Sequence, residues 1–170
     1  VAIYGTNLYV VGTTLNNGVN GIYARMGLPM QATTSQPFQT PYESFNWPSS
    51  AGGTRFNGVH VSLDGGVYVV GDSFTRTVDS VPPDKEAKGI AVRFPSTGFF
   101  SSGVNIGSIW DEQVPSTASS PLFAYYGIEE LKAVVTAREN GTNFVYATGK
   151  GQDTAVHEGR LFLAKLDENG

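Results

Sequence analysis

One arrangement of apolar and polar residues occurs three times along the chain, around a short strand that ends in glycine. This strand reads "TNLYVVGTT" at residues 6–14, "GGVYVVGDS" at 65–73 and "TNFVYATGKG" at 142–151. Each copy has a tyrosine three residues before its glycine. The tyrosines are Tyr9, Tyr68 and Tyr146, and the glycines are Gly12, Gly71 and Gly149. Short runs of β-branched and aromatic residues favour strands, so the sequence predicts one β-rich unit repeated three times.

Further strands are predicted on both sides of each glycine-ending strand. The preceding strands are expected at 1–4, 58–63 and 131–137, and the following strands at 21–26, 89–94 and 161–166. Glycine and asparagine in the turn before each glycine-ending strand favour tight hairpins, and therefore antiparallel pairing. Each following strand carries a basic residue at the same place. These basic residues are Arg25, Arg93 and Lys165.

The alternation of apolar residues is loose, which indicates sheets covered on both faces. A recurring meander with covered faces is typical of sheets stacked around an axis. We therefore expect an all-β fold of β-propeller-type repeats, with four-stranded antiparallel blades and about three blades in this chain. The alternative, a simple β-sandwich, explains the strands but not their recurrence. A helical turn at residues 127–133 is a second open possibility for one segment.

The repeats define one module over residues 1–170, with units at roughly 1–57, 58–128 and 129–170. Propellers close with about four to eight blades, so we expect an incomplete ring. The missing blades would come from a longer chain or from a multi-chain assembly.

Composition removes several classes of function. The net charge is −4 with no basic run, so no nucleic-acid partner is predicted. No stretch approaches the roughly 20 apolar residues of a membrane span. The chain has no cysteine, which excludes disulfides and thiolate metal sites. The 21 glycines and 9 prolines, against 15% charged residues, favour strands and turns over long exposed helices.

Several segments resemble the SBBP-type β-propeller repeat of bacterial and archaeal extracellular proteins. They are "GTRFNGVHVSLDGGVYVVGDS", "GIAVRFPSTG", "YYGIEELKAVV" and "LFLAKLDENG". The first unit departs from the family, because it reads "ARMGLP" where the family has "aKLdp". A Kelch-like propeller is the second resemblance, although its tryptophan after the next strand is lacking. The resemblance implies radially arranged four-stranded sheets and an extracellular or cell-surface location.

The long connections are expected on one face of such a fold. In a propeller, the second-to-third and fourth-to-first connections share a face, and here these connections are the long ones. Long loops on a rigid scaffold are where recognition usually occurs. The candidate binding residues in or beside these loops are Tyr42, Phe45, Trp47, Asp72, Arg76, Trp110, Tyr125 and Tyr126. The alternative for the aromatic residues is a place in the core.

No motif in the sequence predicts a catalytic residue, a metal or a cofactor. The two histidines, His60 and His157, have no further zinc ligands at fixed spacing. The Asp64-Gly65 turn lacks the closing glutamate of a calcium loop. Asn140-Gly141-Thr142 is a glycosylation sequon, and Asn-Gly also forms good turns.

The sequence thus predicts a non-catalytic extracellular or cell-surface scaffold or binding module. It would act in adhesion or assembly through its loops, with a protein partner, with copies of itself or with a glycan. The alternative is a carbohydrate-active enzyme or sugar-binding propeller that uses carboxylates and aromatic residues of the loop face. An enzyme would bring acidic side chains from different blades together.

Overall fold

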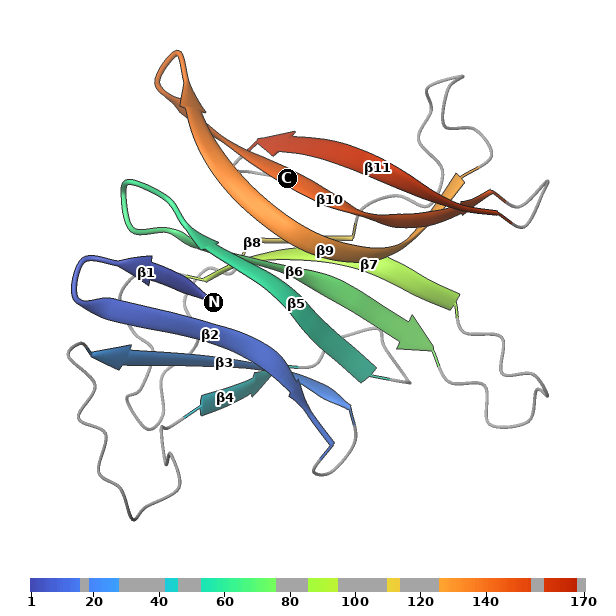
Figure 1. Ribbon diagram of the computed structural model, residues 1–170, viewed down its shortest axis with the longest axis horizontal. Helices are drawn as coiled ribbons and strands as arrows, with labels where there is room; N and C mark the ends of the chain where they lie inside the picture. Colours follow the sequence, from blue (N-terminus) through green and yellow to red (C-terminus); the bar gives the residue numbers. More distant parts are fainter. Residues whose placement is uncertain are drawn as a thin grey trace.

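The computed structural model describes residues 1–15, 19–27, 42–45, 53–75, 86–94, 110–113, 126–153 and 158–167. Within these ranges the chain forms three antiparallel sheets and no helix, which confirms the all-β prediction. Each sheet is built from consecutive strands, so every connection inside a sheet is a hairpin or a meander (Figure 1). The described sheets form an open stack and do not close into a ring.

The first sheet consists of β1 (Ala2–Tyr4), β2 (Asn7–Thr14), β3 (Asn20–Gly27) and β4 (Tyr42–Phe45). The second sheet consists of β5 (Gly53–Val61), β6 (Val67–Thr75), β7 (Glu86–Phe94) and β8 (Trp110–Gln113). The third sheet consists of β9 (Tyr126–Glu139), β10 (Thr142–Asp153) and β11 (Glu158–Asp167). The fourth strands β4 and β8 have only four residues each, and the third sheet has three strands. The segment with the possible helical turn lies in β9, and the expected unit boundaries at 57 and 128 fall inside β5 and β9.

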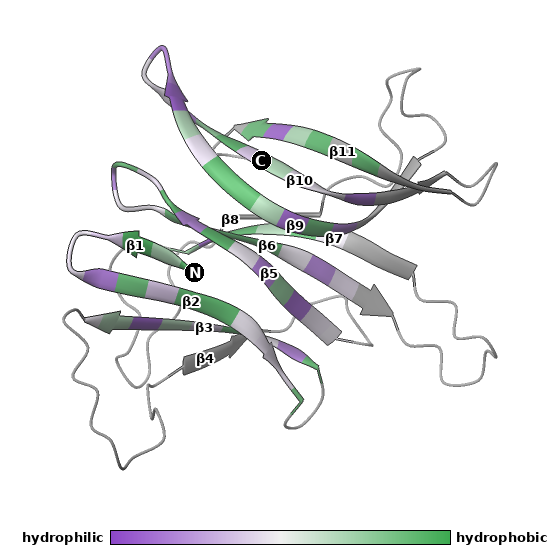
Figure 2. Ribbon diagram, in the orientation of Figure 1, coloured by the Kyte–Doolittle hydropathy of each residue, from purple (hydrophilic) through white to green (hydrophobic). Residues whose placement is uncertain are grey.

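The first strand of each later sheet lies across the sheet before it. β5 packs on β1, β2 and β3, and β9 packs on β5, β6 and β7. The second sheet is therefore covered on both faces, as the loose alternation of apolar residues predicts. On β6, Val67 and Val69 face the first sheet while Val70 faces the third, and all three side chains are fully buried. Figure 2 shows the corresponding hydrophobic stretches in the middle of β2 and β9.

The three hairpin turns lie together at one end of the stack (Figure 1). The Tyr4 hydroxyl donates to the Leu63 carbonyl at 2.8 Å, which joins the first turn to the second. Asn143 Nδ2 donates to Asp64 Oδ2 at 2.8 Å, which joins the second turn to the third. The far ends of β2, β6 and β10, where the second-to-third connections leave, lie at the opposite end. We call this opposite end the loop end.

A β-bulge recurs at the same place in β5 and β9. In β5 the register shifts between Phe56 and Gly58, opposite the repeated glycine Gly71. In β9 it shifts between Leu131 and Ala133, opposite the repeated glycine Gly149. At Gly71, a Cβ atom would lie 1.8 Å from the Arg55 carbonyl oxygen, and at Gly149 it would lie 2.0 Å from the Glu130 carbonyl oxygen. The backbone of the first strand thus approaches so closely that only glycine fits, which explains two of the three repeated glycines.

Candidate functional site

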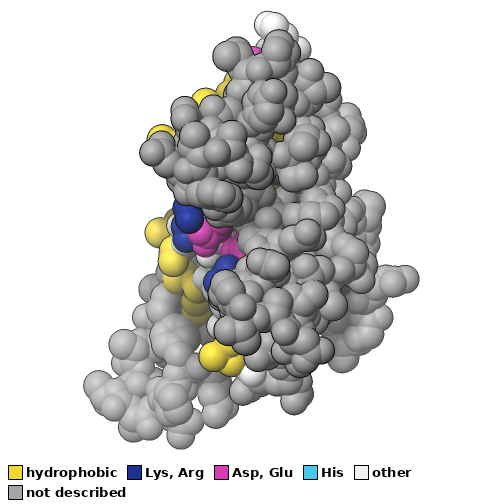
Figure 3. Space-filling view, turned by 90° about the vertical axis from the view of Figure 1, so that its right-hand side faces the viewer, with side chains coloured by type: hydrophobic (Ala, Val, Ile, Leu, Met, Phe, Trp, Pro, Cys, Tyr) yellow, Lys and Arg dark blue, Asp and Glu magenta, His cyan; other side chains and the backbone are white. Residues whose placement is uncertain are grey.

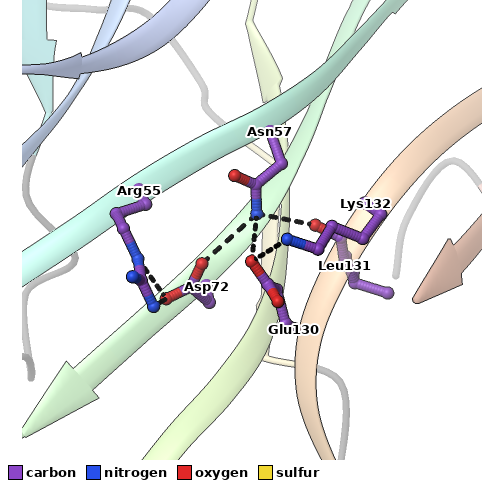
Figure 4. Close-up of polar contacts among 6 residues, drawn as sticks. All are labelled: Arg55, Asn57, Asp72, Glu130, Leu131 and Lys132. Carbon is purple, nitrogen blue, oxygen red and sulfur yellow. Dashed lines mark hydrogen bonds and ion pairs between the residues drawn. The ribbon is translucent and has the colours of Figure 1, made fainter. Parts of the chain in front are cut away.

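Charged side chains gather at the loop end. Figure 3 looks onto this end and shows acidic side chains flanked by basic ones. We call this group the polar cluster; its members are Arg55, Asn57, Asp72, Glu130 and Lys132, together with the Leu131 carbonyl (Figure 4). They come from β5 and β6 of the second sheet and from β9 of the third. The cluster therefore spans the boundary between two sheets.

Asp72 and Arg55 form the half of the cluster that lies within the second sheet. They are direct cross-strand neighbours on β6 and β5. The Asp72 side chain has no exposed surface, whereas that of Arg55 is 41% exposed. Arg55 Nε and Nη2 donate to Asp72 Oδ2 at 2.9 and 2.6 Å. A buried carboxylate requires such charge-assisted hydrogen bonds, because an unpaired buried charge is costly.

Asn57 connects the two sheets. It is the extra residue of the β5 bulge, and bulges re-aim side chains in this way. Its Nδ2 lies 3.3 Å from Asp72 Oδ1, 3.3 Å from Glu130 Oε1 and 2.9 Å from the Leu131 carbonyl oxygen. An amide nitrogen has two hydrogens, so these three acceptors share two donors. Glu130 also forms an ion pair with Lys132, the bulge residue of β9.

The electrostatics of Asp72 are dominated by burial. Desolvation raises the pKa of the Asp72 carboxyl above its ordinary value of 3.8, and the nearby Glu130 carboxylate adds to this rise. The hydrogen bonds and the charge of Arg55, together with the Asn57 amide, act in the opposite direction. Two carboxylates from different sheets thus converge on one amide, with Asp72 shielded from solvent and Glu130 21% exposed.

The residues predicted as a loop-face binding site that fall in the described strands belong to three different sheets. Tyr42 and Phe45 lie in β4, Trp110 in β8 and Tyr126 in β9, so their backbones belong to strands rather than to loops. Aromatic residues favour strands, and this tendency extends the sheets into the stretches predicted as loops.

Asp72 was also predicted in a loop and lies in β6, where it is buried. Among the candidates, it is the one that the described side chains place in the polar cluster. Trp47, Arg76 and Tyr125 lie outside the described residues.

The other members of the cluster were missed, although the repeat carries a signal for them. Aligned on Gly71 and Gly149, the cross-strand pair Arg55–Asp72 of the second sheet corresponds to the pair Glu130–Lys150 of the third, with the charges exchanged. Opposite charges at paired strand positions are favourable, so each pair is placed to stabilise its own sheet.

The two turns considered for metal binding or modification have ordinary turn geometry. Asp64 Oδ1 accepts hydrogen bonds from the Ser62 hydroxyl and from the Gly66 amide, and the Ser62 bond is the main cause of the lowered Asp64 pKa. Asn140 has a φ of 50° and Gly141 a φ of 87°, as a tight Asn-Gly hairpin requires. Asn140 is exposed, and its glycosylation stays a prediction. Among the described residues, no three His, Asp or Glu side chains are grouped so that they could hold a metal ion.

The part of the chain that the structure describes contains no apolar helix of membrane-spanning length. Comparisons with protein-family models, with curated proteins and with solved structures yield no match to this chain.

Proposed function

We propose that this chain is a non-catalytic, propeller-type repeat module that acts as a scaffold or binding module in adhesion or assembly. Three features support the propeller-type arrangement: the sheets follow one another in chain order, each is covered by the first strand of the next, and the hairpin turns share one end. The resemblance of the repeats to SBBP-type propellers supports an extracellular or cell-surface location.

The non-catalytic proposal rests on one observation, which is that Asp72 in the polar cluster is fully hydrogen-bonded and buried. Asp72 Oδ2 accepts from Arg55, Asp72 Oδ1 accepts from Asn57, and the Asp72 side chain has no exposed surface. Asn57 in turn binds the backbone of the third sheet through the Leu131 carbonyl. These bonds hold two sheets together, and they leave Asp72 no access to a substrate.

The carbohydrate-active alternative is favoured by one specific observation. Asp72 Oδ1 and Glu130 Oε1, from different sheets, each lie 3.3 Å from the same nitrogen of Asn57. Glycosidases use two carboxylates at short separation with different pKa values, and burial raises the pKa of Asp72. Because a general acid must reach the leaving-group oxygen, the complete burial of Asp72 favours the structural role.

A panel of chromogenic glycosides separates these two functions. We expect no turnover by the chain, and we expect Asp72→Asn to lower the unfolding temperature because it weakens the contact between the sheets. Glu130→Gln is the matched variant, since its side chain is partly exposed and keeps the same shape. Turnover that Glu130→Gln abolishes while the unfolding temperature stays unchanged would contradict the non-catalytic proposal.

A further inference from the structure

Each sheet has one face marked by the repeated tyrosine. In the first sheet Ala2, Tyr9 and Arg25 lie side by side across three strands. The equivalent row in the second sheet is His60, Tyr68 and Arg93, and in the third sheet it is Val135, Tyr146 and Lys165. We call the face that carries this row the tyrosine face, and the other side of each sheet the opposite face.

The next sheet covers the tyrosine face in both places where a next sheet is present. Tyr9 is 3% exposed and packs in the core between the first and second sheets. Tyr68 is 1% exposed, and its face lies against the third sheet together with Val70 and Ala91. The contact of one tyrosine face with the opposite face of the following sheet is therefore the repeated interface of this fold.

The tyrosine face of the third sheet is open and carries three exposed aliphatic side chains beside Lys165. Val135 is 50% exposed, Leu163 is 66% exposed and Leu161 is 85% exposed. The register places all three on the same face as Tyr146. Figure 2 shows hydrophobic residues along both strands that carry them, β9 and β11. The equivalent face of the second sheet is buried under the third sheet. Exposed apolar side chains on this face therefore indicate a contact site.

The opposite face of the first sheet is open as well. Ile3 is 67% exposed there, and Val10 lies on the same face and is half-buried. Val10 is the residue after the repeated tyrosine, as are Val69 in the second sheet and Ala147 in the third. Both equivalents are 0% exposed, because each packs against the sheet before it. The chain thus carries both halves of its own repeated interface, one at each end of the stack.

We propose that the tyrosine face of the third sheet binds the opposite face of the first sheet in a second copy of this chain. The proposal rests on the repeat architecture of the proposed scaffold, and it names the partner of that scaffold. A head-to-tail contact of this kind is heterologous and can close into a ring. Two copies bring six sheets, and this number lies within the range of about four to eight blades that is typical of closed propellers.

The test is the solution mass of the whole chain by light scattering or sedimentation velocity, for the wild type and three variants. Ile3→Glu alters the open face of the first sheet, and Leu163→Glu alters that of the third. Leu63→Glu is the matched control, since Leu63 is 85% exposed but lies in a hairpin turn off both faces. We expect a species of at least twice the 18.1 kDa chain mass for the wild type and Leu63→Glu. Ile3→Glu and Leu163→Glu should each be monomeric.

Mixing the two monomeric variants tests the head-to-tail geometry. Each variant keeps the face that the other has lost, so an equal mixture should restore association through one intact interface. A monomeric wild type overturns the proposal. So does an oligomer that Ile3→Glu leaves intact, because two third sheets would then pair with each other. Circular dichroism confirms that each variant is folded.

A cross-linking experiment keeps the proposal testable if a glutamate variant fails to fold. In the internal interface Ala91 and Ala147 belong to one cluster, and their equivalents across two copies are Leu163 and Val10. The chain has no cysteine, so a mixture of Val10→Cys and Leu163→Cys chains has one possible mixed disulfide. We expect that disulfide to form, and Leu63→Cys in place of Leu163→Cys should not give it. Glycoside turnover would overturn the proposed function without changing these masses, so the two failures are distinguishable.

Discussion

Arg93 lies directly across the β6–β7 pair from Tyr68, and its guanidinium carbon stands 5.6 Å from the centre of the tyrosine ring. The third sheet repeats this relationship, with Lys165 Nζ 5.4 Å from the ring centre of Tyr146. In both sheets a cation on the third strand lies over the aromatic residue that marks the repeat, and Lys165 Nζ also lies 4.0 Å from the ring centre of Phe144.

Replacing Arg93 with methionine should therefore lower the free energy of unfolding. The methionine keeps an apolar stem against the ring and removes the charge. Because Tyr68 is 1% exposed, we expect a loss of about 1–2 kcal/mol in urea denaturation, the range of a partly desolvated cation–π contact. A double-mutant cycle with Tyr68→Leu isolates the coupling, and additive effects would show that the contact contributes nothing. Lys165→Met, on an exposed face, should have a smaller effect.

The three glycines of the repeat should differ in their tolerance of alanine. At Gly71 the added Cβ would meet the Arg55 carbonyl oxygen at 1.8 Å, and neither backbone has room to move in a buried sheet. At Gly12 it would meet only the Ile22 side chain at 3.6 Å, which is ordinary contact. We expect Gly71→Ala to cost about 3 kcal/mol or more. Gly12→Ala should change stability by no more than about 1 kcal/mol.

Thermal and urea unfolding of the two variants measure this difference, and Gly149→Ala provides an independent repeat of the first. Its Cβ would meet the Glu130 carbonyl oxygen at 2.0 Å, so it should behave like Gly71→Ala. Equal effects at all three glycines would contradict the role that the structure gives to the close approach of β5 and β9.

The strands could be predicted from the sequence, because the residues that indicate each strand lie close together along the chain. The tyrosine, the turn and the glycine of each unit lie within a few residues of one another, and they predicted the three meanders that the sheets form. The fourth strands were harder, because β4 and β8 have four residues each and give no clear alternation. Tyr42, Phe45 and Trp110 were therefore predicted in or beside loops, whereas their backbones form these short strands.

The polar cluster could not be predicted, because it depends on how the sheets stack. Asn57 and Glu130 are 73 residues apart in the sequence and meet only because β9 lies across the second sheet. The bulge that aims Asn57 at the third sheet is likewise a property of the paired strands rather than of the segment alone. Of the cluster, the sequence predicts only Asp72, as a loop residue with a role in binding.

Removing Arg55 should destabilise the protein in a pH-dependent way. Burial already raises the pKa of Asp72, and Arg55 is the main group that opposes this rise. In Arg55→Ala the folded-state pKa of Asp72 therefore rises further above the unfolded value of about 3.8. The unfolded state then releases its proton first, so the free energy of unfolding falls as the pH rises from about 3.8 to the folded-state pKa.

We expect Arg55→Ala to cost about 1–3 kcal/mol at neutral pH, the cost of leaving a buried acceptor unsatisfied, and less near pH 3. Urea denaturation from pH 3 to 7.5 measures the difference. In the double variant Arg55→Ala with Asp72→Asn the added pH dependence should disappear, because no carboxyl remains to titrate. A cost for Arg55→Ala that is the same at every pH would show that Asp72 is not the group affected.

His60 should make the protein less stable as the pH falls below neutrality. Burial lowers the pKa of its imidazole from the ordinary value of 6.5. As the pH drops through 6.5, the unfolded chain takes up the proton first, so the free energy of unfolding decreases down to the folded-state pKa of His60. His60→Val should remove this decrease. Valine suits the site, because Val135 occupies the equivalent position across from Tyr146 in the third sheet.

Urea denaturation between pH 5 and 8 tests this prediction, and a titration of the imidazole signals by NMR places the folded-state pKa directly. The second histidine of the chain, His157, provides the control, since His157→Gln should leave the pH dependence intact. If the dependence survives His60→Val and is lost in His157→Gln, His60 is not its source. If His60→Val flattens the curve, the half-buried imidazole beside Tyr68 is the group that lowers the protein's stability at mildly acidic pH.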